Sequence, residues 1–277
     1  MLTQREIEKY IHVGRRGEII CLDSTVSTNL AAAQMAADGA ADGTVIVADS
    51  QTGGMGRLGR SFYSPAGAGI YLSYIKKLDT GDGSVIFKII EPSPVSMSNL
   101  GLLTSMAGLA VCDAIISVCE LSPQIKWPND IIIAGKKVCG ILTKLITDTK
   151  TNRITHAIIG IGINVNQCEG DFPEELAEKA GSLRMALGQD LNRTKLCAEI
   201  INRLDTLFFK ENALYADTAP YVSRLREVSC VLGKKVTVSP PEGEETVLAL
   251  DIAPDGGLVV QTDSGTKVIR TGEIVAG

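Results

Sequence analysis

A glycine-rich stretch, SQTGGMGRLGRSF (residues 50–62), combines four glycines with two arginines and contains no acidic residue. Neighbouring glycines let main-chain N–H groups converge on an anion, and the planar guanidinium groups of Arg57 and Arg60 suit a carboxylate or a phosphate. The stretch therefore predicts an anion-binding loop that is mobile when empty and closes over its ligand. The alternative, on these residues alone, is a flexible surface turn with two solvated arginines.

The loop also matches two phosphate-binding motifs in its letters, and both motifs require a helix to begin at the loop. Gly54 to Gly59 fit the dinucleotide motif GxGxxG, and Gly54 to Ser61 approximate a P-loop with Arg60 in place of the lysine. The following residues, RSFYSPAGAGIYLS, contain one proline and two glycines, which disfavour a helix, and the last of them are predicted to form a strand. Both motifs are therefore disfavoured.

A second segment that carries polar residues, KWPND (126–130), comes at the end of the predicted strand QIKW (124–127). Pro128 has no N–H for a strand ladder, so the chain should turn there and deliver Lys126 into a site at the strand end. Further on, the apolar segment GIGINVN (160–166) carries Asn164, whose amide needs partners when it is buried. Main chain or a ligand could supply those partners, and KWPND could also be a simple Asx turn.

Hydrophobic periodicity predicts the elements that position these residues. Ser27 and Thr28 are expected to cap the second helix. The predicted helices cover residues 3–12, 29–39 and 98–119 and recur through 182–228; the predicted strands cover 18–22, 44–50, 70–75, 124–127, 130–134, 137–147 and 156–166; and a turn is predicted at 79–84. Short strands with Gly and Asp turns follow, so we expect an α+β domain at 1–228 and a small β-barrel domain at 229–277.

Composition argues against several classes of protein. The chain has 27 basic and 32 acidic residues, a net charge of −5, whereas a general nucleic-acid binder is usually basic. The seven cysteines form no CxxC pair, which favours free thiols. The two histidines, His12 and His156, lie far from each other and from any cysteine at ligand spacing, which argues against a zinc site and against a Ser–His–Asp triad. No apolar run is expected to be long enough for a membrane span and no export signal is expected, so a cytoplasmic protein is predicted.

Several segments, taken in this order, resemble the catalytic domain of biotin protein ligases, also called biotin–[acetyl-CoA-carboxylase] ligases. They are STN (27–29), SQTGGMGRLGRSFYSPAGAGIYLS (50–73), KWPND with GKKVCGIL (126–142) and GIGIN (160–164). The resemblance covers roughly residues 20–277. It implies a mixed β-sheet domain of the biotin/lipoate ligase type, class II synthetase-like, followed by an SH3-like β-barrel.

The same resemblance implies an activity and roles for residues. Such enzymes join biotin to ATP, supplied with Mg²⁺ and without a tightly bound metal, to form biotinyl-5′-AMP, and pass biotin to a lysine of a biotin carboxyl carrier protein. The implied biotin-binding residues are Ser27, Thr28, Asn29, Gln51, Met55, Gly56, Arg57, Lys126 and Gly140, and the implied nucleotide-binding residues are Arg57, Arg60, Lys126 and Asn164. Arg57 and Lys126 are the implied catalytic residues, because they would neutralise two anions that repel each other.

Departures from the family pattern and alternatives are also visible. Met55 and Leu58 stand where relatives often carry arginines, and Val26 stands where an acid commonly precedes STN. A lipoate or octanoate ligase is one alternative, although its loop would carry a histidine, and a non-catalytic biotin or nucleotide sensor is another. About twenty residues precede the catalytic domain, fewer than a winged helix-turn-helix needs, so we expect no DNA binding. Membrane association is not expected either, because no apolar run is expected to be long enough to span a membrane. The resemblance allows a homodimer through the central sheet.

Overall fold

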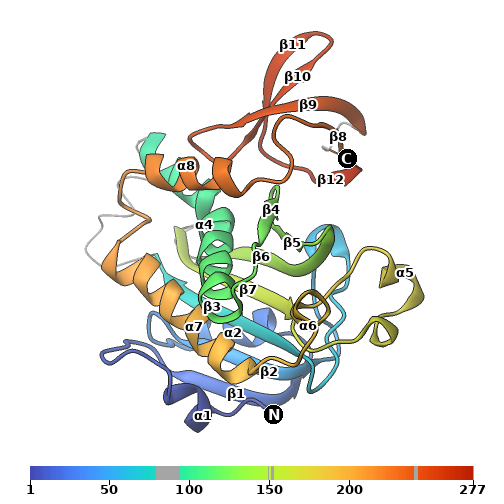
Figure 1. Ribbon diagram of the computed structural model, residues 1–277. Helices are drawn as coiled ribbons and strands as arrows, with labels where there is room; N and C mark the ends of the chain where they lie inside the picture. The colour runs from blue at the N-terminus through green and yellow to red at the C-terminus, as the bar shows by residue number, and fades with distance from the viewer. Residues whose placement is uncertain (79–93, 149, 151–152, 240–242, 277) are drawn as a thin grey trace.

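The computed structural model describes residues 1–78, 94–148, 150, 153–239 and 243–276. In this part of the chain, a seven-stranded sheet with helices on both faces forms the larger unit, and a five-stranded antiparallel sheet stands beside one end of it (Figure 1). The predicted α+β class and the predicted small C-terminal β unit are confirmed. The boundary between 228 and 229 stays a prediction, although helix α8 (Ala219–Val228) ends there.

The large sheet has the strand order β1-β2-β3-β7-β6-β5-β4. The strands are β1 (Ile19–Thr25), β2 (Val45–Gln51), β3 (Gly69–Lys77), β4 (Gln124–Lys126), β5 (Asp130–Ile133), β6 (Lys136–Asp148) and β7 (Arg153–Asn164). Only β1 and β2 pair in parallel among these strands, and β1 continues past its predicted end because it pairs with β2 as far as Thr25 and Gln51. All seven predicted strands of this region are present.

Helices cover both faces of the large sheet. On one face, α2 (Thr28–Ala37) brings the small side chains of Ala32 and Ala36 against the sheet. On the other face, α4 (Pro94–Cys119) and α7 (Arg193–Asp205) enclose the main hydrophobic core (Figure 1). The central strand β3 is therefore buried on both sides, which explains its continuous apolar sequence.

Helix α4 corrects one expectation. Its segment Leu100–Cys119 is long and apolar enough to cross a membrane by length and composition, so the expectation that no run reaches that size is wrong. Yet 72% of this apolar segment is buried inside the protein. Side chains shielded by the sheet and by α7 are typical of a core helix.

The start of α2 also differs from the prediction. Ser27 does occupy the N-cap position, but its side chain makes no capping hydrogen bond, and Thr28 is the first residue of the helix. Gln51, at the end of β2, performs the capping instead, because its Oε1 accepts the Thr28 N–H at 2.9 Å. The predicted cap at Thr3 is confirmed, since its hydroxyl accepts the Glu6 N–H.

The remaining helices and turns are short. They are α1 (Gln4–Glu8), α5 (Glu174–Ala177), α6 (Leu183–Leu187), a π-helical turn (Thr206–Lys210), and short 3-10 turns at Arg57–Gly59 and Glu169–Asp171. The first helix is shorter than predicted, and the turn predicted at 79–84 lies outside the described residues. The C-terminal sheet has the order β11-β10-β9-β8-β12, with strands β8 (Lys235–Val238), β9 (Glu245–Ile252), β10 (Leu258–Thr262), β11 (Gly265–Ile269) and β12 (Ile274–Ala276).

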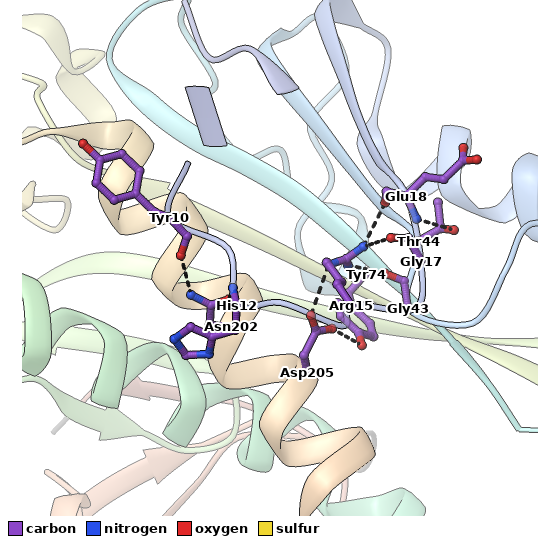
Figure 2. Close-up of polar contacts among 10 residues, drawn as sticks. All are labelled: Tyr10, His12, Arg15, Gly17, Glu18, Gly43, Thr44, Tyr74, Asn202 and Asp205. Carbon is purple, nitrogen blue, oxygen red and sulfur yellow. Dashed lines mark hydrogen bonds and ion pairs between the residues drawn. The ribbon is translucent and has the colours of Figure 1, made fainter. Parts of the chain in front are cut away.

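A buried polar cluster fastens the segment before β1 to the rest of the domain (Figure 2). Arg15 lies 3.1 Å from Asp205 at the end of α7, measured from Nε to Oδ2, and donates to the main-chain carbonyls of Gly17 and Gly43. The Tyr74 hydroxyl, from β3, donates to the other carboxylate oxygen of Asp205 at 2.8 Å. One carboxylate thus ties a helix, a strand and the N-terminal segment together.

Candidate active site

A cavity of about 790 Å³ lies between the α2 side of the large sheet, the glycine loop and the C-terminal sheet. This volume is in the range of small-molecule sites. All the residues that the family resemblance predicts to bind biotin or nucleotide line this cavity. They are Ser27, Thr28, Asn29, Gln51, Met55, Gly56, Arg57, Arg60, Lys126, Gly140 and Asn164. Which substrate each of them contacts stays a prediction.

The start of α2 supplies a buried polar wall of the cavity. Ser27, Thr28 and Asn29 are at most 4% exposed. The Thr28 hydroxyl lies 3.1 Å from Gln51 Oε1, and the Ser73 hydroxyl donates to Asn29 Oδ1 at 2.6 Å. The Ser27 hydroxyl has no hydrogen-bond partner among the described residues, so this wall offers a polar group to a ligand.

Glycines of β7 make room for the side chains that shape this wall. A Cβ on Gly160 would lie 2.2 Å from Asn29 Oδ1, and a Cβ on Gly162 would lie 2.6 Å from the Phe62 ring. Real atoms do not approach so closely, so a Cβ at either position would displace the neighbouring side chain. The two glycines therefore let two side chains of the site, Asn29 and Phe62, lie directly against the strand.

The glycine loop folds back on itself as a small hairpin. Met55 and Ser61 form a β-bridge, the Gly56 N–H donates to Arg60 O at 2.7 Å, and Arg57 opens the 3-10 turn at the tip. Leu58 in that turn has a φ of 54° and is exposed. The next element is strand β3, so the helix that both phosphate motifs require is absent from this described segment.

Arg57 and Lys126 reach the same cavity from separate segments. Arg57 Nη1 donates to Asn129 Oδ1 at 3.3 Å, and Asn129 is itself held by its Nδ2 donating to Ile141 O at 3.1 Å. Burial lowers the pKa of the Arg57 guanidinium, against the opposing effect of Asp130 and Glu273. Lys126 is the last residue of β4, and its side chain makes no hydrogen bond or ion pair with the residues described. Two cations facing one cavity suit a pair of anionic ligands.

Two predicted nucleotide contacts already have protein partners. Asn164 Nδ2 donates to Gly181 O at 3.0 Å, and its Oδ1 accepts from Gln167 at 3.3 Å. Main chain and a neighbouring amide thus satisfy this side chain, which is 5% exposed. Arg60 forms an ion pair with Glu273, just before β12.

The sequence did not reveal that the C-terminal sheet lines the cavity. Its contribution consists of Val231, Lys234, Val236, Glu273, Ile274 and Val275, and the segment after β7 adds Phe172, Glu175, Leu176, Glu178, Lys179 and Ala180. No motif marks these residues, because their position depends on how two sheets pack. The ion pair between Lys137 and Asp130, at 2.6 Å, was also missed although both residues lie in quoted segments.

Neither a nucleophilic thiol nor a metal cluster is evident in this cavity. Cys230 lines it, but burial raises the pKa of its thiol, against the opposing effect of Lys234 and Lys126, so the thiol is protonated at neutral pH. The described residues contain no group of three or more His, Cys, Asp or Glu side chains that could hold a metal ion. The chemistry that this arrangement favours is charge neutralisation between bound anions.

Comparisons with known proteins identify the class of protein. Residues 19–164 match the biotin/lipoate A/B protein ligase family, and residues 231–277 match the biotin protein ligase C-terminal domain. The chain therefore belongs to the biotin/lipoate A/B protein ligase family. This confirms the resemblance inferred from the motifs, the predicted fold and the predicted ligase class of enzyme.

Individual relatives cover almost the whole chain. The chain is 33% identical to the bifunctional ligase/repressor BirA of Bacillus spizizenii, over 100% of this chain and 79% of the relative. It is 31% identical to the biotin–[acetyl-CoA-carboxylase] ligase of Mycobacterium tuberculosis, over 91% and 86% of the two chains. The biotin protein ligase from Aquifex aeolicus in complex with biotin and ATP has a similar structure, with a TM-score of 0.71, 28% identity, and coverage of 92% and 97%.

Proposed function

We propose that this chain is an ATP-dependent biotin protein ligase, which activates biotin to biotinyl-5′-AMP and then transfers biotin to a specific lysine of a biotin carboxyl carrier protein. The observation that carries the proposal is that Arg57 and Lys126, from distant segments, line one cavity whose buried wall is Ser27 to Asn29. The relative from Aquifex aeolicus, of similar structure, binds biotin and ATP, which supports the same pair of substrates here.

In the first step, the biotin carboxylate is itself the nucleophile. One of its oxygens attacks the α-phosphorus of ATP, the bond from that phosphorus to the bridging oxygen breaks, and pyrophosphate leaves. The obstacle is repulsion between carboxylate and phosphate, which the Arg57 guanidinium and the Lys126 ammonium offset while aligning both groups. ATP arrives as its Mg²⁺ complex, and the ion supplies further charge neutralisation on the phosphates.

The acyl-adenylate must then be protected from water. The hairpin of the glycine loop and the C-terminal sheet both border the cavity, and the Arg60–Glu273 ion pair joins them. A closed loop retains the mixed anhydride until the acceptor arrives. Arg60 therefore holds the loop in place through its ion pair with Glu273. We also propose that Arg60 contacts the nucleotide.

The decisive experiment measures ATP–pyrophosphate exchange with biotin or lipoate, followed by incubation with biotin, MgATP and a carrier domain. We expect biotin-dependent exchange, none with lipoate, and a biotinylated lysine identified by mass spectrometry. Exchange with lipoate would favour the lipoate ligase alternative. Biotin binding without exchange would favour the sensor alternative.

Partners and location complete the proposal. We place the enzyme in the cytoplasm, with a homodimer through the central sheet as the assembly to test by light scattering. DNA is not among the proposed partners, although the Bacillus spizizenii relative is named a repressor. A salt-sensitive, sequence-specific shift in a gel-mobility assay would contradict that part of the proposal.

A further inference from the structure

A second cavity, of about 880 Å³, lies on the α4 side of the sheet, next to the first. Its floor and sides come from Thr104 of α4, Thr143 of β6 and the turn between β9 and β10, at Asp255 to Gly257. The two cavities share a wall, which consists of Arg57, Trp127, Pro128, Ile141 and Leu142. A group entering the second cavity therefore comes into contact with residues that also line the first, Arg57 among them.

The proposed reaction needs such a second approach. Biotin and ATP together occupy the first cavity, and the acyl-adenylate stays there with its carbonyl carbon close to the residues that aligned the two anions. The acceptor amine must reach that carbon without displacing the adenylate. A separate route that ends at Arg57 meets this requirement.

The residues that line both cavities have the right chemistry for a lysine side chain. Trp127 is 5% exposed, and its indole N–H donates to Gly256 O at 2.9 Å, which fixes the ring between the cavities. The Trp127 ring and the Ile141 and Leu142 side chains provide apolar surface for methylene groups. Thr104 Oγ1 donates to Thr143 Oγ1 at 2.9 Å, which places polar oxygens among these apolar groups.

The position of Thr143 in the sheet shows how an acceptor segment can approach. Strand β6 pairs with β5 as far as Gly140, and Ile141 still bonds to Asn129. From Thr143 onward, the strands of the described chain pair only with the β7 side of β6. As far as the described residues go, the other edge of β6 is thus open to an extended segment of the acceptor, beside Thr143 of the second cavity.

We propose that the second cavity is the route by which the acceptor lysine reaches the acyl-adenylate, an inference that rests on the proposed function. The neutral amine nitrogen attacks the carbonyl carbon, the bond from that carbon to the phosphate oxygen breaks, and AMP leaves with the electron pair. The nitrogen gives one proton to water in the cavity. The Arg57 charge, whose hydrogen-bond partner is a neutral amide, favours the unprotonated amine.

Two cavity-filling variants test the route. Thr143→Phe projects a ring from a strand, where aromatic residues are well tolerated, and Thr104→Leu fills the cavity from the α4 side. Thr147→Phe is the matched control, because Thr147 is an exposed residue of the same strand outside both cavities. The measurements are biotin-dependent pyrophosphate exchange and single-turnover transfer from preformed biotinyl-AMP to a carrier domain or to hydroxylamine, a small amine.

We expect both variants to keep exchange and reaction with hydroxylamine but to transfer biotin to the carrier domain about 100-fold more slowly, with the control unchanged. Transfer at the wild-type rate in either variant would overturn the route. A parallel loss of exchange and transfer would also overturn it, because a block specific to the acceptor is required. Absence of biotin-dependent exchange in the wild type would instead remove the proposed function itself.

Discussion

Arg60 in the glycine loop forms an ion pair with Glu273, which lies 213 residues further along the chain. The Arg60 side chain is 65% exposed and that of Glu273 is 15% exposed, so solvent screens the pair and its contribution to stability is small. Its consequence is positional, since it connects the loop over the cavity to the C-terminal sheet. The first prediction tests this connection.

Glu273→Gln should release the loop with a loss of less than about 1 kcal/mol in the free energy of unfolding. The half-life of the complex with biotinyl-AMP, measured by gel filtration with labelled biotin, should shorten several-fold. Glu245→Gln is the control, because Glu245 pairs with Lys267 at 2.5 Å within the C-terminal sheet and away from the loop. Equal half-lives for the two variants would contradict the positional role.

Lys126→Ala should abolish adenylation while the protein still folds. Removing a charged donor from the reacting phosphate costs about 100-fold in rate or more, so biotin-dependent exchange should fall at least that much. Lys235→Ala, an exposed position on β8, is the control and should exchange normally. Normal exchange by the Lys126 variant would refute its catalytic assignment.

Arg57→Ala should retain the adenylate less well. Its guanidinium bridges the loop to Asn129, so its loss should let biotinyl-AMP escape and react with free amines in solution. The measurement starts from preformed biotinyl-AMP bound to the protein and follows the rate of hydroxamate formation in excess hydroxylamine, which should rise in the alanine variant; Arg57→Lys, which keeps the charge without the planar fork, is the comparison. An unchanged leakage rate in the alanine variant would count against a retaining role.

Gly160→Ala should weaken biotin binding. The new Cβ would collide with the Asn29 side chain and displace it from its bond to Ser73, at a cost of about 1–3 kcal/mol in stability. Gly170→Ala is the control, because nothing lies within 4 Å of the corresponding Cβ. Isothermal titration with biotin measures the difference, and equal affinities would show that Asn29 does not shape the site.

Asp205 should make stability depend on pH. Burial raises the pKa of this carboxyl group above its ordinary value of 3.8, against the opposing effect of Arg15 and the Tyr74 hydroxyl, with smaller influences from Asp42 and His12. Because the folded protein binds this proton more tightly, the stabilisation is complete below pH 3.8 and is lost as pH rises through the folded-state pKa.

The measurement for Asp205 is urea unfolding of the wild type and of Asp205→Asn between about pH 3.5 and 5.5. The stability of the wild type relative to the variant should decline as pH rises across this window. A constant difference would mean that the cluster in Figure 2 leaves the carboxyl pKa unshifted.

Much of the fold followed from the sequence because local patterns determine strands and helices. The apolar runs of β3 and β7 and the small residues of α2 were sufficient to place them. Helix ends were less accurate, since Gln51 replaces Ser27 as the capping group of α2 and comes from a distant strand. A side chain from elsewhere in the sheet leaves no trace in the helix sequence.

The sequence was sufficient to predict part of the candidate site, namely the segments with unusual residue types. The glycine loop and KWPND drew attention through residue types, and both line the cavity. Glu273 and Lys234 drew none, because an isolated glutamate or lysine in a β-rich segment is ordinary until two sheets pack together. The hydrogen bond from Trp127 to Gly256 likewise depends on tertiary structure alone.

Trp127 has one more consequence. The chain contains a single tryptophan, which lines both cavities and whose ring N–H donates to Gly256 O in the turn between β9 and β10. Emission from this indole is therefore free of overlap from any other, and its wavelength responds to the polarity on either side of the ring. The enzyme carries a built-in fluorophore with which vitamin loading, nucleotide arrival and movement of the small sheet can be timed in a stopped-flow instrument without labelling.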